Sequence, residues 1–128
     1  MKRFFLIILS AVVLFSISPA FADEYVTKVA GVTFDNYDGT SRQNYLARFY
    51  FANGGSAYGS GSLLEYEYEG SPAIYVLLGD NIIGNIPAVE VPYVLSLITQ
   101  IDEVCVYVSR FYSDDGELIY YARVILEY

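Results

Sequence analysis

Carboxylates are the most abundant groups in this chain that could carry out chemistry. The 128 residues include fifteen Asp and Glu, seven Lys and Arg, and no histidine. Without histidine, neither the usual proton shuttle nor a His-assisted serine or cysteine nucleophile can form. Glu65, Glu67 and Glu69 could in principle supply a general acid and base, but they alternate with apolar and aromatic residues, as on the solvated face of a strand. We therefore expect a protein that is not an enzyme, with a carboxylate-based hydrolase as the remote alternative.

Metal-binding patterns are equally sparse. The run from Asp35 to Thr40 resembles the start of a calcium loop. If Gly39 takes the sixth position of such a loop, however, Phe34 falls first and Tyr45 twelfth, where carboxylates are needed. Zinc would find no histidine and one cysteine, Cys105, which fits a small buried hydrophobe within an apolar run and cannot form an internal disulfide. We expect no metal and no cofactor, with a weak, irregular calcium site as the alternative.

Three residues near the start of an expected helix are candidates for binding a ligand. Phe34 and Tyr37 offer aromatic faces on which a ligand can stack. Arg42 lies close to the free amides of a helix N-terminus, where a basic side chain would help to hold an anion. The alternative for Arg42 is a salt bridge to Asp35 or Asp38.

The elements that would position these residues follow from local patterns. Alternation from Val29 to Phe34 predicts a strand, and the polar turn that follows ends at Gly39. Thr40 and Gln43 have the spacing of a capping box, which predicts a helix from Ser41 to about Phe49.

This opening resembles the HIRAN domain, an accessory module of DNA helicases and nucleases. The likeness rests on Gly-Val-Thr-Phe at 31–34, Asp-Gly-Thr-Ser-Arg-Gln at 38–43, Pro-Ala-Ile-Tyr-Val at 72–76 and Ile-Gly-Asn-Ile-Pro at 83–87. It extends from about Val26 to Glu127. The resemblance implies an OB-like barrel and binding of nucleic acid, in particular a DNA end.

The remainder of the chain predicts a mostly β protein with two short helices, an α+β fold of about six strands in a small β-barrel or strongly curled sheet. The resemblance implies that this barrel is OB-like. Gly and Ser residues between Ala52 and Ser62 predict a flexible loop. A strand follows in which Leu64, Tyr66 and Tyr68 form the buried face. The later expected elements are strands at 73–78 and 82–86, a helix at 91–98 and a hairpin of 104–112 with 117–127.

The first 22 residues have the pattern of a signal peptide. Lys2 and Arg3 precede an apolar run from Phe4 to Ile17, and Ala20-Phe21-Ala22 forms a cleavage motif. We expect cleavage between Ala22 and Asp23 and a protein secreted or held in the cell envelope. A retained anchor is the alternative. Residues 23–128 then form a single HIRAN-like β domain.

The net charge of the chain after removal of the signal peptide limits the kind of partner that it can bind. Removing Lys2 and Arg3 leaves five basic residues against fifteen acidic ones, a net charge of minus ten. Such a balance repels phosphate backbones, so electrostatics opposes the nucleic-acid binding that the resemblance implies. Fourteen tyrosines favour the alternative, an envelope or extracellular module that contacts protein or glycan. The sequence leaves the ligand open.

Overall fold

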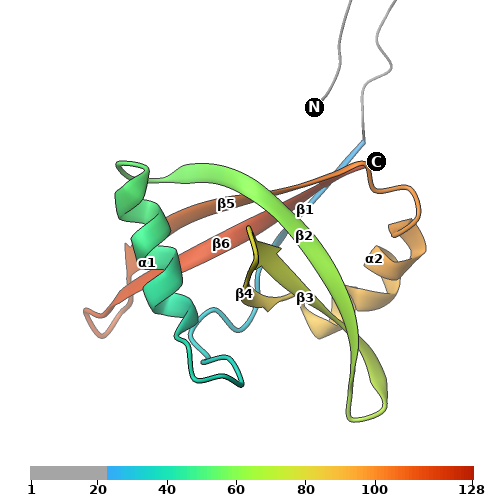
Figure 1. The fold of residues 1–128 in the computed structure, drawn as a ribbon, viewed down its shortest axis with the longest axis horizontal. Coiled ribbons are helices and arrows are strands. Elements are labelled where there is room, and N and C mark those ends of the chain that lie inside the picture. The colour runs from blue at the N-terminus through green and yellow to red at the C-terminus, as the bar shows by residue number, and fades with distance from the viewer. Residues whose placement is uncertain (1–22) are drawn as a thin grey trace, which may run out of the picture.

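Residues 23–128 form one antiparallel sheet with a short α-helix at either side, as described by a computed structural model (Figure 1). The predicted signal peptide lies outside the described residues. The predicted mostly β class with six strands and two short α-helices is confirmed. The elements are β1 (Glu24–Lys28), α1 (Arg42–Ala52), β2 (Ala57–Tyr68), β3 (Ser71–Leu78), β4 (Asn81–Asn85), a 3-10 turn (Ala88–Glu90), α2 (Val91–Leu97), β5 (Glu103–Tyr112) and β6 (Leu118–Glu127).

The sheet is strongly curled but not closed. Its strand order is β1-β6-β5-β2-β3-β4, so β1 and β4 are the two edges. A single bridge joins these edges, in which Ala30 and Asn85 exchange two backbone hydrogen bonds of 2.8 Å. The chain then turns away at Gly31, which has a φ of 74°, and within residues 23–128 no second bridge joins the two edges. Full barrel closure is therefore replaced by one point of contact.

The core lies on the concave side of the sheet. Alternate residues of β3, β5 and β6 are buried there, as the two-residue period of a strand requires. Leu46 of α1 and Val94 of α2 are fully buried against them. Among residues 23–128, no helix is both long and apolar enough to cross a membrane.

The segment before α1 differs from the sequence prediction. The predicted strand Val29–Phe34 is wrong, because β1 ends at Lys28 and residues 31–34 form a turn closed by a bond from Phe34 N to Gly31 O. The helix cap is also shifted by one residue. Ser41 is the N-cap and its side chain accepts from Asn44 N at 3.1 Å. The Thr40 hydroxyl instead donates to Asp38 Oδ1 at 2.6 Å, within the turn.

The predicted Gly/Ser loop is wrong over most of its length, because Gly59 and Gly61 belong to β2. Both glycines permit close packing. A Cβ at Gly59 would lie 2.7 Å from Leu78 Cδ1 and 2.8 Å from Phe49 Cζ, and one at Gly61 would lie 2.7 Å from Val106 Cγ2. At both glycines neighbouring side chains pack directly against the strand backbone. The glycines therefore allow close packing and do not indicate a flexible segment.

The outer half of β2 is less buried than its alternation predicts. Leu64 and Tyr68 are 50% and 57% exposed, and Tyr66 is half-buried. The predicted buried face is therefore wrong. Leu64 and Tyr66 are paired with Tyr75 and Ala73, which alternate with the buried Ile74, so these side chains point away from the core. The β2–β3 hairpin also extends past the body of the sheet (Figure 1). The three glutamates of this segment are exposed, as predicted.

The C-terminal half follows the prediction closely. α2 begins with Pro92 in its first turn, and the β5–β6 hairpin turns at Gly116, which has a φ of 83°. Cys105 is half-buried, not a core residue, because it lies on the outer side of β5. Burial raises the pKa of its thiol.

Candidate ligand-binding groove

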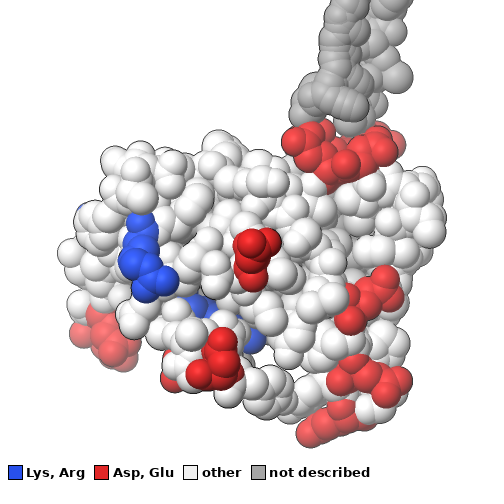
Figure 2. Space-filling model, in the orientation of Figure 1, with Lys and Arg blue, Asp and Glu red and all other residues white. Residues whose placement is uncertain are grey.

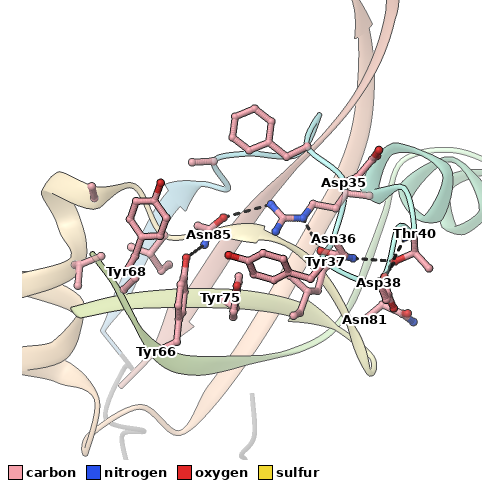
Figure 3. Close-up of a pocket in the computed structure, with 18 of the residues that line it drawn as sticks. Asp35, Asn36, Tyr37, Asp38, Thr40, Tyr66, Tyr68, Tyr75, Asn81 and Asn85 are labelled. Atoms are coloured by element: carbon pink, nitrogen blue, oxygen red, sulfur yellow. Dashed lines mark hydrogen bonds between the residues drawn. The ribbon is translucent and has the colours of Figure 1, made fainter. Parts of the chain in front are cut away.

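A groove of about 920 Å³ lies between the loop before α1, the β2–β3 hairpin and β4 (Figure 3). Its lining combines five aromatic rings, three aspartates, three asparagines and a single arginine. These residues are Phe34, Tyr37, Tyr66, Tyr68, Tyr75, Asp35, Asp38, Asp80, Asn36, Asn81, Asn85 and Arg42.

The fold brings the three predicted ligand residues together in this groove. Phe34 and Tyr37 are 67% and 98% exposed, so their rings are available to a ligand at the rim. Arg42 is only 6% exposed and forms part of the floor. Glu65, Glu67 and Glu69, considered above as a possible acid and base, do not line the groove.

Neutral oxygen atoms hold the Arg42 guanidinium. Its Nε donates to Asn36 Oδ1 at 2.8 Å, and its Nη1 donates to Gly31 O at 2.9 Å and to Asn85 Oδ1 at 3.3 Å. The alternative of a salt bridge to Asp35 or Asp38 is not found among residues 23–128. Amide and carbonyl oxygens occupy the guanidinium, and Asp38 is bonded to Thr40. The cation is therefore buried and fixed without a neutralising carboxylate.

A second set of contacts extends the floor from Arg42 to the hairpin. Asn85 Nδ2 donates to the Tyr66 hydroxyl, and the Tyr66 ring stacks on Tyr75 with centroids 3.8 Å apart and an interplanar angle of 7°. Burial, together with the neighbouring Tyr75, raises the pKa of Tyr66. The hydroxyl therefore stays protonated at neutral pH, and the floor presents a rigid aromatic surface next to amide groups.

Hydrogen bonds also fix the rim. Asn36 Nδ2 donates to Ile82 O at 3.2 Å and so ties the loop before α1 to β4. Asp38 accepts from Thr40 N at 3.0 Å and from the Thr40 hydroxyl at 2.6 Å. These bonds hold the pKa of the Asp38 carboxyl below its usual value. An aspartate that stays ionised in this way suits hydrogen-bond acceptance and not the role of a general acid.

Sequence reasoning missed the stacked pair of tyrosines and the two asparagines that hold Arg42. The register of the hairpin pairs Tyr66 with Ala73, which places Tyr75 on the diagonal two residues away. Diagonal partners on one face of a sheet are within reach of aromatic side chains. The hairpin turns at Glu69 and Gly70, so the stack follows once the position of this turn fixes the register.

The charge around the groove is mostly negative. On the face drawn in Figure 2, acidic side chains lie at several places and the basic ones do not form a continuous track. Within the groove, three aspartates accompany one buried arginine. The described part of the chain contains no group of three or more His, Cys, Asp or Glu residues placed to hold a metal ion.

No protein-family model matches this chain, and no match was found among curated proteins or solved structures.

Proposed function

We propose that this chain is a non-enzymatic binding module whose groove takes an uncharged, hydroxyl-rich ligand, a glycan. One observation carries the proposal. The groove combines exposed aromatic rings with amide and carboxylate acceptors, and its only cation is buried under neutral oxygen atoms.

The lining suits a sugar chemically. The axial C–H groups of a pyranose carry partial positive charge and pack against the negative face of an aromatic ring. Phe34, Tyr37 and Tyr68 offer such faces at the rim, since each is more than half exposed. Sugar hydroxyls donate to carboxylates and pair with amides, so Asp35 and Asn81 can fix the orientation of a ring. The acidic surroundings do not oppose a neutral ligand.

Nucleic acid is the second candidate, because Phe34, Tyr37 and Arg42 lie together in one groove, as the HIRAN resemblance implies. Bases could stack on the two rings. The guanidinium of Arg42, however, is committed to three acceptors and is 6% exposed, so it offers at most one phosphate contact. Residues 23–128 hold four other basic residues against fifteen acidic ones, which opposes binding of a polyanion.

A protein that binds glycan is expected where glycans are exposed, which agrees with the secretion signal inferred from the sequence. We propose that the chain is cleaved between Ala22 and Asp23 and acts in the envelope or outside the cell. N-terminal sequencing of the accumulated protein should begin at Asp23. An intact Met1 in a membrane fraction would instead indicate an anchored protein.

The decisive experiment compares ligands on the same protein. Neutral oligosaccharides and single-stranded DNA are titrated at low and at physiological salt. We expect binding to at least one neutral glycan that does not depend on salt, and no measurable affinity for DNA at physiological salt. Tyr37→Ala and Tyr68→Ala should each weaken glycan binding by about tenfold, the scale of one lost aromatic contact.

A matched control is Tyr112→Ala, because Tyr112 is 71% exposed and lies at the end of β5, outside the groove. It should leave glycan affinity unchanged. Micromolar DNA binding at physiological salt that is lost in Phe34→Ala would replace the glycan proposal with the nucleic-acid one. Equal loss in the Tyr37 and Tyr112 variants would show that the groove is not the site.

A further inference from the structure

The outer half of β2 has one paired edge and one unpaired edge. Toward β3 its pairing is continuous from Gly61 to Tyr68. Toward β5 the pairing ends at Ser60, and within residues 23–128 no strand continues it beyond that point. In Figure 1 this half of β2 leads into the hairpin that projects from the sheet. β2 is therefore a central strand over its first half and an edge strand over its second half.

The hydrogen-bond pattern shows which backbone groups lie on the unpaired edge. Gly79 N donates to Ser60 O at 3.0 Å, and alternate residues of an antiparallel strand bond to the same neighbour. The even-numbered residues of β2 therefore bond to β3, and the odd-numbered ones point their N–H and C=O groups the other way. Pro72 agrees with this assignment, because it is paired with the odd-numbered Glu67 and has no N–H to donate.

Leu63, Glu65 and Glu67 are the odd-numbered residues of this edge. Each presents one N–H and one C=O group to the outside, and such an edge is a template for another strand. Proline, lysine and β-bulges commonly prevent pairing at an edge. The segment from Gly61 to Tyr68 has none of them, since its register with β3 is continuous. Its charges are carried by glutamates alone.

The two glutamates select the kind of strand that can pair there. Glu65 and Glu67 are exposed, and their side chains lie on the same side of the sheet because they are two residues apart. Antiparallel pairing of the edge with a second copy, centred on either glutamate, would place that residue opposite itself. Like charges in directly opposed positions destabilise a sheet, whereas basic residues there would be attracted. The excess of acidic residues in the whole chain also draws a basic partner toward it.

We propose that this edge of β2 binds an extended segment of a partner protein, which adds an antiparallel strand next to Leu63, Glu65 and Glu67. The segment carries lysine or arginine at two alternate positions, opposite the two glutamates. Hydrogen bonds between main chains supply the affinity, and the charge pairs select the register and the partner. The proposal does not depend on a ligand in the groove.

A capped heptapeptide, Thr-Lys-Thr-Lys-Val-Val-Thr, is the probe. Antiparallel pairing places its lysines opposite Glu67 and Glu65 and its second valine opposite Leu63. It is titrated into the protein in the form that the expressing cell accumulates. We expect saturable binding that weakens as the salt concentration rises, since exposed charge pairs are screened. A peptide with glutamate in place of both lysines should not bind. If the lysine peptide does not bind at low salt, the proposal is overturned, and the glutamates serve only to keep the edge unpaired.

Backbone methylation tests whether the peptide binds as a strand. N-methylation of both lysines removes the N–H groups that would face β2, so binding should be lost. The matched control carries the two methyl groups on its third and fifth residues, whose N–H groups would point to solvent, and it should still bind. Equal loss with the two placements would overturn the proposed strand pairing.

A charge reversal tests the two glutamates. The double variant Glu65→Lys with Glu67→Lys should bind the lysine peptide about tenfold more weakly and should bind the glutamate peptide instead. The matched control is Asp115→Lys with Glu117→Lys, which makes the same change in net charge near the exposed turn between β5 and β6. The control should keep its affinity for the lysine peptide. Equal loss in the two double variants would show that net charge attracts the peptide, and would overturn the proposed site.

Amide hydrogen exchange locates the added strand. Binding of the lysine peptide should slow exchange at Leu63, Glu65 and Glu67, whose N–H groups lie on the unpaired edge. The Leu64 and Tyr66 amides already bond to β3, so their exchange should change little. Slower exchange that is confined to other segments of the chain would overturn the proposal.

Discussion

Arg42 and Arg110 lie at the two ends of helix α1 and are held in opposite ways. Arg42 is 6% exposed and donates to three oxygen atoms, two in the loop before α1 and one in β4. The Arg110 guanidinium lies over the rings of Tyr50 and Phe51, at 4.6 and 5.5 Å from their centroids, with one bond of 3.3 Å to the Tyr120 hydroxyl. Arg42 is therefore buried and held by hydrogen bonds, whereas Arg110 is held mainly by cation–π contacts with two aromatic rings.

This difference shows which end of the molecule is preorganised. Hydrogen bonds from a buried guanidinium have fixed directions, so Arg42 sets the positions of the loop before α1 and of β4 relative to each other. A cation over aromatic rings tolerates many orientations. The groove end therefore offers a ligand a formed surface, and binding there loses little entropy. The following variants test how far the contrast holds, from the largest expected effect to the smallest.

Arg42→Ala should have the largest effect. It leaves the side chains of Asn36 and Asn85 and the Gly31 carbonyl without their donor, and the expected loss in the free energy of unfolding is about 3 kcal/mol. Chemical denaturation measures it. Arg42→Lys keeps the charge but not the fork of donors, so it should recover only part of the loss. A loss below about 1 kcal/mol for Arg42→Ala would show that the guanidinium does not organise the groove.

Gln43→Ala tests whether Gln43, which follows Arg42 in α1, also holds neighbouring segments in place through hydrogen bonds of its side chain. Its Nε2 donates to Val32 O at 3.1 Å and to Tyr120 O at 2.6 Å, and its Oε1 accepts from Tyr120 N at 2.9 Å. These bonds join α1 to β6, and we expect a loss of about 2 kcal/mol. The exposed neighbour Asn44, changed to Ala, is the control and should cost little. Equal losses in the two variants would contradict the assigned role of Gln43.

The parts of the fold that the sequence predicted well are those set by local chemistry. The β5–β6 hairpin depends on the turn at 113–116, and α2 on Pro92 in its first turn, and both were found where expected. The sequence predictions were wrong where contacts between residues far apart in the chain determine the local structure. The sequence pattern places Gly59 in a loop, but Gly59 pairs with Val106 in the sheet. Its missing side chain leaves the space that Leu78 and Phe49 occupy.

The sequence singled out three residues that the fold places in one groove, and their role in binding stays a prediction. Phe34, Tyr37 and Arg42 do line one groove. The partners of Arg42 could not be predicted, because Asn85 lies 43 positions along the chain and meets Arg42 only after β4 joins the sheet edge at Ala30. Nearby aspartates look like better partners in sequence, and only the folded register favours the amides.

Tyr25 is intermediate between Arg42 and Arg110, because it is half-buried and its hydroxyl bonds to one charged partner. It donates to Glu90 Oε1, and this bond, together with burial, raises the pKa of Tyr25 to about 12. Tyr25→Phe keeps the ring contact with Tyr93 but should cost about 1.5 kcal/mol at neutral pH. Because the pKa in the folded state is above the ordinary value of 10, the stabilisation is complete below pH 10 and is lost as the pH rises toward 12.

Unfolding measured from pH 8 to 12 checks this behaviour. The difference between the original chain and Tyr25→Phe should be constant up to about pH 10 and should then fall. A difference that stays constant to pH 12 would mean that the hydroxyl does not bond to Glu90 in solution.

Ser41→Ala should cost about 1 kcal/mol, since it removes the side-chain acceptor of the Asn44 amide at the start of α1. Thr40→Ala is the control, because the Thr40 hydroxyl bonds within the exposed turn and not to the helix. It should cost less than half as much. A reversed order would make Thr40 the N-cap of α1, as the capping-box pattern predicted, and would weaken the account of how Arg42 is positioned.

Arg110→Ala should have the smallest effect, within the error of chemical denaturation. The Tyr50 and Tyr120 rings keep their edge contact at 5.5 Å without the guanidinium, and the position of Arg110 at the end of β5 leaves space to water and not to a buried void. The bond that Arg110 donates to the Tyr120 hydroxyl raises the pKa of Arg110, so the guanidinium stays charged in the original chain and the effect of the substitution should not depend on pH. A destabilisation equal to that of Arg42→Ala would remove the contrast between the two ends of α1. Stacking on Tyr50 and Phe51 would then have to be counted, like the groove floor, among the contacts that hold the helix on the sheet.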